Sequence, residues 1–181
     1  ETAAWRAAYE RRYAPLRSLP APSLRGVTAT IHLVPAERRW TARGSASLVN
    51  ETLRPIDTVW VAVRRDVTIG ALALEGGGGA AHDDRFGMHG FVLPRALAPG
   101  DTAVLTFELA ARRRTLSANS FSEAVAPNGT FLVSLAFLPT IGFRNGYTLI
   151  DPRLRTANGL PASAPPAGAM EGDADDFNVR A

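Results

Sequence analysis

Three histidines, His32, His82 and His89, are the side chains of this sequence best suited to metal binding or proton transfer. His82 and His89 flank Asp83 and Asp84, so two imidazoles and a carboxylate could together hold a metal ion. The same pattern fits an ordinary polar hairpin loop, which is the interpretation we favour. His32 falls out of phase with the apolar positions around it, and we expect it to face solvent.

The other reactive side chains lack the companions that catalysis requires. The chain has no cysteine, no HExxH motif and no G-x-S-x-G elbow, and its serines have no adjacent general base. The glycine run at residues 76–79 is not followed by the Lys-Ser/Thr pair of a phosphate-binding loop. Residues 168–171 spell G-A-M-E, most of a motif with which zinc aminopeptidases hold a substrate amine, but no zinc ligands accompany it and we interpret the match as coincidence. We therefore predict no catalytic residue, no metal site and no cofactor in this chain.

Length and composition predict one globular domain with some tail. The chain has 181 residues, of which 46% are hydrophobic and 20% charged, and this balance excludes wholesale disorder. All 20 basic residues are arginine, which we attribute to codon bias, with an anion-binding surface as the alternative. The arginines are scattered and form no basic stripe with interleaved aromatics, so we expect no nucleic-acid partner.

The ends of the chain suggest a piece of a longer protein. Residue 1 is Glu1 rather than methionine, and no signal peptide is visible. The longest apolar stretch, residues 131–141, is interrupted by Ser134 and Pro139 and is shorter than the ~18 apolar residues that a membrane span needs. We expect that the segments addressing the protein to its compartment lie outside this sequence.

The hydrophobic pattern changes from a helical period to a period of two near residue 25. Helical spacing of Trp5, Ala8 and Tyr9 predicts a helix over residues 2–13, too short to be stable unless it docks on another element. Alternation and turn residues predict strands, with a bulge or bend at Gly44. The predicted strands cover residues 25–34, 39–50, 56–63, 67–74, 90–94, 102–110 and 130–138.

Short strands separated by Pro, Gly and Asn turns predict an all-β fold, an antiparallel β-sandwich with a short N-terminal helix and an irregular Pro-rich C-terminal tail. We divide the chain into a helix and connector (1–24), the β-sandwich domain (25–150) and a Pro-rich acidic linker or tail (151–181).

The apolar run at residues 131–138 has no two-residue alternation. Because one face of an antiparallel strand usually meets water, two apolar faces suggest that something covers the outer one. The cover could be a neighbouring domain, the Pro-rich tail, or the N-terminal helix lying over a central strand. The first of these makes the segment a candidate domain interface, comprising Phe131, Val133, Leu135, Phe137, Leu138, Pro139, Ile141 and Phe143.

Several stretches between residues 9 and 161 carry a resemblance to a known family. They are Y-E-R-R-Y-A-P-L at 9–16, L-P at 19–20, the strands at 27–34 and 40–50, N-E-T at 50–52, P-I-D at 55–57 and L-A-P-G-D-T at 97–102. The most specific are N-G-T-F at 128–131, L-P-T-I-G-F at 138–143, D-P-R at 151–153 and G-L-P at 159–161. Together they resemble the N-terminal β-sandwich of the aminopeptidase N-type zinc metallopeptidase module that is fused to bacterial ABC-transporter permeases.

This resemblance implies a non-catalytic accessory domain that shapes the cleft of a downstream peptidase-like domain. The zinc would belong to that absent catalytic domain, and a transmembrane permease region would be a further partner. The protein would lie on the extracytoplasmic (periplasmic) face of the bacterial inner membrane. One alternative is a free-standing carbohydrate- or protein-binding module, which predicts exposed aromatics on a flat face. The other is an enzyme in its own right, for which the sequence offers no set of catalytic residues.

Overall fold

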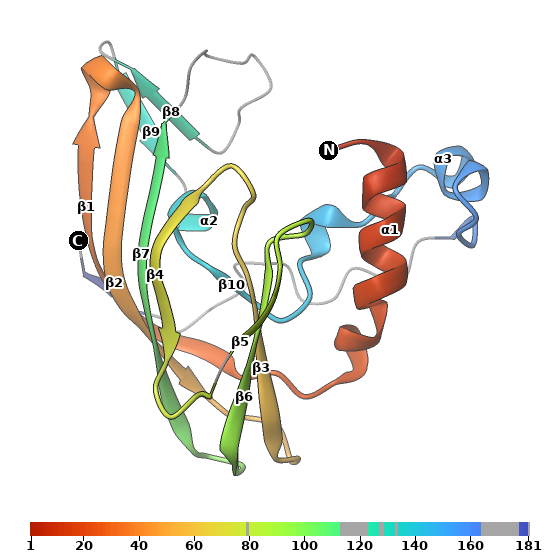
Figure 1. The fold of residues 1–181 in the computed structure, drawn as a ribbon, viewed down its shortest axis with the longest axis horizontal. Coiled ribbons are helices and arrows are strands. Elements are labelled where there is room, and N and C mark those ends of the chain that lie inside the picture. Colours follow the sequence, from red (N-terminus) through yellow and green to blue (C-terminus); the bar gives the residue numbers. More distant parts are fainter. Residues whose placement is uncertain (79, 113–122, 127–128, 133, 164–177, 181) are drawn as a thin grey trace.

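The computed structural model describes residues 1–78, 80–112, 123–126, 129–132, 134–163 and 178–180. Two β-sheets pack face to face, and helix α1 (Ala3–Tyr13) lies on the outer side of the smaller one (Figure 1). This architecture confirms the predicted all-β sandwich with a short N-terminal helix.

The strands form a large sheet of order β11-β1-β2-β7-β4 and a small sheet of order β10-β3-β6-β5, while β8 and β9 form a separate hairpin. The strand bounds are β1 Ser23–Val34, β2 Arg39–Val49, β3 Ile56–Ala62, β4 Thr68–Leu74, β5 Ala80–Asp83, β6 Met88–Leu97, β7 Thr102–Arg112, β8 Glu123–Ala126, β9 Gly129–Leu132, β10 Thr140–Ile141 and β11 Asn178–Arg180. The remaining helical segments are η1 Ala14–Ser18, η2 Pro35–Glu37, α2 Ser134–Phe137, η3 Asn145–Tyr147 and α3 Pro152–Ala157.

The sandwich core lies between the two sheets and follows the two-residue period of the strands. Strands β1, β2, β3, β4 and β7 begin and end close to the predicted limits, whereas β6 is longer than predicted and its partner β5 was not predicted. The side chains that the large sheet buries are Val27, Ala29, Trp40, Ala42, Ala46, Leu48, Leu74, Ala103, Leu105, Phe107, Leu109 and Ala111. Those that the small sheet buries against them are Ile56, Val59, Val61, Phe91, Leu93 and Leu97.

The expectation of a bulge at Gly44 is wrong. Gly44 pairs with Ala29 on one side and with Phe107 on the other, inside uninterrupted registers. The irregularity between β1 and β2 lies elsewhere, at Leu24 and Gly26. A Cβ atom on Gly44 would collide with the backbone oxygen of Thr28, so the glycine is required by a close approach of two backbones.

The predicted strand at residues 130–138 is confirmed as far as Leu132 and is wrong for Ser134–Phe137. Strand β9 ends at Leu132, and Ser134–Phe137 form the single helical turn α2. A run without alternation is compatible with a buried helix as well as with a buried strand, and periodicity alone does not separate the two. Pro139 then ends the helical turn, because a proline disfavours helical geometry in the residue before it.

Helix α1 begins where the sequence predicted it. The Thr2 side chain accepts a hydrogen bond from the Trp5 backbone N–H at 3.2 Å, which caps the first turn. The helix ends at Tyr13 and continues into η1, which has Pro15 in its first turn. Its docking on the small sheet supplies the stability that so short a helix lacks by itself. Within the described residues, none of the helices combines the length and the apolar character that crossing a membrane requires.

Candidate domain interface

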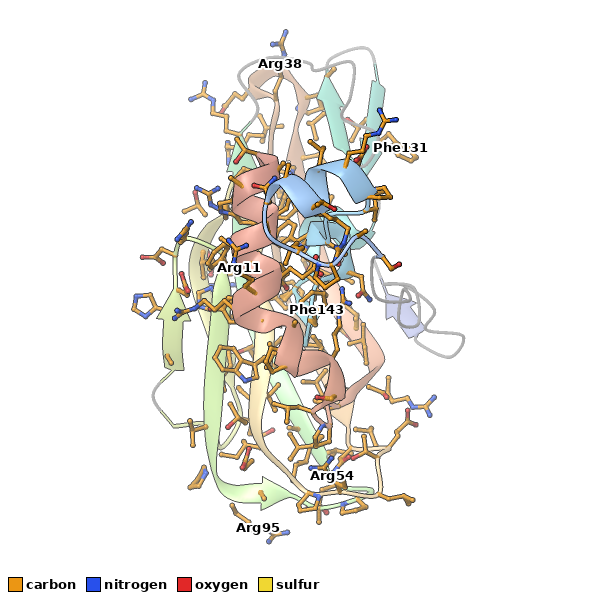
Figure 2. All side chains as sticks on the ribbon, turned by 90° about the vertical axis from the view of Figure 1, so that its right-hand side faces the viewer. Arg11, Arg38, Arg54, Arg95, Phe131 and Phe143 are labelled. Atoms are coloured by element: carbon orange, nitrogen blue, oxygen red, sulfur yellow. The ribbon has the colours of Figure 1, made fainter. Side chains whose placement is uncertain are left out.

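The residues predicted as a domain interface do not form one exposed patch. Phe131, at the end of β9, is 56% exposed, whereas Phe137 and Phe143 are buried inside this chain. Figure 2 shows Phe131 at the upper edge of the molecule, away from Phe143, which lies beside α1. Pro139 is buried, and Leu138 and Ile141 pack partly buried against the sandwich core.

The side chains of two predicted interface residues are not described by the structure. Val133 lies outside the described residues, and Leu135 is described only as part of α2. The interface therefore stays a prediction. Of its placed members, Phe131 is exposed and available to a neighbour, while Phe137 and Phe143 are already buried within the chain.

Phe143 belongs to an aromatic layer between α1 and the small sheet. Tyr9 lies at its centre, fully buried, with ring centroids 5.1 Å from both Phe143 and Tyr147. Trp60 of β3 and Phe86, between β5 and β6, belong to the layer from the sheet side. Pairs of this kind contribute about 0.5–1.5 kcal/mol each beyond their buried area. The aromatic layer thus fixes the segment after β10 against the N-terminal helix.

Polar contacts from α1 and η1 hold the same segment at the turn formed by residues 144–148. The Tyr9 hydroxyl accepts a hydrogen bond from the Arg144 backbone N–H at 2.8 Å. Arg6 Nη1 donates to the backbone oxygens of Gly146 and Thr148, each at 3.3 Å. Arg17 Nη2 donates to Thr148 Oγ1 at 2.7 Å. These contacts join residues more than 120 positions apart in the chain.

A buried ion pair connects α1 to α3. Glu10 is 4% exposed and Arg155 is 1% exposed, and their side chains meet in a fork with Nη1–Oε2 at 2.9 Å and Nη2–Oε1 at 2.8 Å. Arg155 Nε also donates to the Pro161 oxygen at 2.7 Å. Asp151 caps α3 by accepting from the Arg153 and Leu154 backbone N–H groups. The predicted tail thus begins with a capped helical turn anchored on α1.

The two histidines singled out in the sequence meet across the β5–β6 hairpin. His82 pairs directly with His89, and His82 is exposed. Burial, followed by the neighbouring His82, lowers the pKa of His89, whereas Asp84 acts to raise it. His32 is exposed, as predicted.

Asp83 serves α1 rather than the histidine pair. Its Oδ2 accepts a hydrogen bond from the Tyr13 hydroxyl at 2.9 Å and forms an ion pair with Arg12 Nε at 2.9 Å. In the described part of the chain, no three His, Cys, Asp or Glu side chains are grouped closely enough to hold a metal ion. An open hollow of about 710 Å³ beside this contact has a lining of mixed charge, which includes Arg11, Arg12 and Asp84.

The sequence pointed to only part of this arrangement. Tyr9 and Glu10 lie in a stretch that carries the family resemblance and Arg155 lies between two others, yet no local pattern indicated that Glu10 and Arg155 meet. Nothing in the sequence indicated the contacts that the arginines of α1 and η1 make, because their partners lie in a distant segment. Residues 168–171, with their partial aminopeptidase motif, and residues 164–177 of the predicted tail lie outside the described residues.

Comparisons with known proteins give a likeness in fold and none in sequence. No protein-family model matches the chain, and no curated protein matches it. The chain is similar to a crystal structure of an M1 zinc metallopeptidase from Deinococcus radiodurans, with a TM-score of 0.51 and 14% sequence identity over 66% of this chain. A mutant form of the Deinococcus radiodurans enzyme aligns with a TM-score of 0.49 and 16% identity, again over 66% of this chain. The chain covers 28% of the length of each of these structures, and at this identity the likeness concerns the fold alone.

Proposed function

We propose that this chain is a non-catalytic β-sandwich accessory domain that packs against a peptidase-like domain of a longer parent protein. The observation that carries the proposal is the fold likeness to an M1 zinc metallopeptidase, at a TM-score of 0.51. Because the chain covers 28% of that structure, the likeness leaves most of the metallopeptidase without a counterpart here. A fold does not determine a function, so the proposal needs support from the chain's own chemistry and surface.

The chemistry of the described residues supports a non-catalytic role. They offer no group of three metal-ligating side chains, and a catalytic zinc site requires three protein ligands. Asp83, the carboxylate nearest in sequence to the histidine pair, is bound to Tyr13 and Arg12. In this proposal the zinc belongs to the peptidase-like domain.

Exposed apolar side chains support a role in packing. Phe131 is 56% exposed, Ile150 is 76% exposed and Leu154, on α3, is 45% exposed. Burial of side chains of this size contributes roughly 1.5–3 kcal/mol each, which favours their use as contacts. Ile150 and Leu154 lie on either side of the Asp151 cap, where the chain leaves the aromatic layer.

The parent protein follows from the sequence resemblance. We propose that it is a membrane-anchored fusion of an ABC-transporter permease with an aminopeptidase-like module, in which this domain lies on the extracytoplasmic face. The downstream peptidase-like domain and the transmembrane permease region are its proposed partners.

The alternative, a free-standing carbohydrate- or protein-binding module, has less support from the surface. Binding faces of that kind present exposed aromatic rings, yet Trp40 is fully buried and Trp60 packs under α1. Of the large apolar side chains that are exposed in the described part of the chain, Phe131 alone is aromatic.

An association experiment tests the proposal. The chain is mixed with the rest of the parent protein's extracytoplasmic region, made separately, and binding is measured by analytical ultracentrifugation. We expect a complex that Ile150→Asp and Phe131→Asp weaken, and that Leu53→Asp leaves unchanged, because Leu53 is 96% exposed on the turn before β3. Hydrolysis of aminoacyl reporters by the chain alone, one bound zinc per chain, or retention on a glycan array without any complex would each contradict it.

A further inference from the structure

Arg144 is a buried arginine, and one nitrogen of its guanidinium has no acceptor among the described residues. It is 9% exposed, and its Nη1 atom is fully buried with no hydrogen-bond partner among the described residues. Its backbone is well fixed, because the Arg144 N–H donates to the Tyr9 hydroxyl and its carbonyl oxygen accepts from the Tyr147 N–H at 3.1 Å. A buried charge without a partner is strongly unfavourable, so the rest of the protein is expected to supply a compensating group.

Tyr147 places a second unused donor beside this cation. The Arg144 guanidinium carbon lies 4.9 Å from the centroid of the Tyr147 ring. Tyr147 is 5% exposed, and its hydroxyl is buried without a hydrogen-bond partner in the part of the chain that the structure describes. Burial is the main cause that raises the pKa of this phenol, so the hydroxyl keeps its proton and can donate.

The other buried arginine shows what this fold normally provides. Arg155 is buried more deeply than Arg144, yet both of its terminal nitrogens donate to the carboxylate of Glu10. A carboxylate satisfies an arginine well because its two oxygens accept in the geometry in which the guanidinium donates. The structure therefore satisfies the Arg155 guanidinium with a carboxylate and leaves Arg144 Nη1 without an acceptor among the described residues.

The surrounding charges favour a singly charged ligand. Besides Arg144, the charges felt by the Tyr147 phenol are those of Glu1, Asp66 and Arg64. Arg64 is bound to Asp66 by hydrogen bonds of 3.0 and 2.6 Å. Because Arg64 offsets Asp66, Glu1 is the negative charge left in range, and it repels a doubly charged phosphate more strongly than a carboxylate of charge −1.

We propose that Arg144 and Tyr147 form a carboxylate-binding site whose occupant is an acidic side chain of the neighbouring domain. The identity of the occupant rests on the proposed function, whereas the ligand chemistry rests on the two buried donors. Glu1 is a carboxylate of this chain that could occupy the site instead, and the variant Glu1→Gln separates it from an external occupant.

The first test uses the chain alone and acetate as the probe. Thermal unfolding is followed in sodium acetate and in sodium chloride of equal ionic strength for the wild type, Arg144→Met, Arg144→Gln and Tyr147→Phe. Arg54→Met is the matched control. Arg54 is exposed and lies just before the start of β3, whereas Thr140 pairs with Ala62 at the end of that strand. We expect acetate to raise the Tm of the wild type and of Arg54→Met by about 2 °C over chloride, because a ligand that binds only the folded state stabilises it.

The same shift should be absent in both Arg144 variants and smaller in Tyr147→Phe. Equal Tm values in acetate and chloride for both the wild type and Glu1→Gln, or an acetate effect that survives in both Arg144 variants, would overturn the site. A larger effect of phosphate than of acetate would overturn the assignment to carboxylates. A response that appears only in Glu1→Gln would make Glu1 the occupant and overturn the external source.

The second test separates this inference from the proposed function. In the association experiment, Arg144→Met should weaken the complex at least tenfold, while Arg54→Met should leave it unchanged. If acetate binds at Arg144 but no complex forms, the proposed function fails and the carboxylate site stands. If a complex forms whose affinity Arg144→Met does not change, the proposed occupant is wrong.

Discussion

The sandwich core and the layer between α1 and residues 143–161 are held together by different interactions. The core between the sheets is aliphatic for the most part, and its members follow one another along strands at a period of two. The α1 layer is built from aromatic rings, an ion pair and backbone contacts of arginines. Its partners are up to 147 residues apart. The core is specified by local patterns, whereas the α1 layer depends on directional contacts between the two ends of the domain.

The largest effect should come from the core. Trp40→Ala removes a fully buried indole from β2 and is expected to cost about 3–5 kcal/mol of the free energy of unfolding, because the cavity cannot close. Urea denaturation followed by circular dichroism measures the loss. Leu53→Ala is the control and should change the stability by less than about 0.5 kcal/mol, since Leu53 is exposed. Equal effects of the two changes would contradict the assignment of the core.

The next largest effect should come from the ion pair of the α1 layer. Glu10→Ala leaves the buried Arg155 without its carboxylate and should cost about 3 kcal/mol. The double variant Glu10→Met with Arg155→Leu should recover most of that loss, because two apolar side chains pack without desolvation costs. The exposed pair Arg43–Glu108 is the matched control, and Glu108→Ala should cost at most about 1 kcal/mol. If the double variant is as unstable as Glu10→Ala, unpaired charge is not the cause.

A smaller change removes the Tyr9 hydroxyl, which accepts from the Arg144 backbone N–H and also donates to Met88 Sδ at 4.0 Å. Tyr9→Phe keeps the ring in the aromatic layer but removes the acceptor of the Arg144 backbone N–H, and it should cost about 1–3 kcal/mol. The cost should appear as faster hydrogen exchange at the Arg144 amide as well as in the unfolding midpoint. Tyr13→Phe removes a hydroxyl that binds the partly exposed Asp83 and should cost less. Unchanged exchange in Tyr9→Phe would show that this bond does not hold the turn.

The smallest effect should be a pH dependence at the β5–β6 hairpin. Burial lowers the folded-state pKa of His89, so the folded state binds its proton less readily than the unfolded state. The stabilising contribution is therefore present above the ordinary histidine pKa of about 6.5 and is lost as the pH falls towards the folded-state value. Denaturation at pH 7.5 and pH 5 should show a loss that His89→Gln reduces and that His32→Gln leaves intact. A loss independent of His89 would assign it to other groups.

Local patterns predicted the elements better than their contacts. The alternation in residues 25–34 and 39–50 placed β1 and β2 correctly, and the helical spacing of Trp5, Ala8 and Tyr9 placed α1. The run at residues 131–138 misled because a continuous apolar stretch carries no period. The prediction of a bulge at Gly44 was wrong because a glycine can stand in a strand for several reasons, and only the positions of the neighbouring strands decide among them.

The sequence by itself determined the two-sheet architecture and the N-terminal helix, because alternation, caps and turn residues act between neighbours in the chain. Tertiary structure alone decided that α1 covers the small sheet, that Glu10 meets Arg155, and that Phe137 and Phe143 are buried. It also decided that Arg144 is buried beside Tyr147 with no acceptor among the described residues. Ion pairs and aromatic contacts form between residues whose distance in the chain carries no signal, so they emerge only once the sheets have brought the two ends of the domain together.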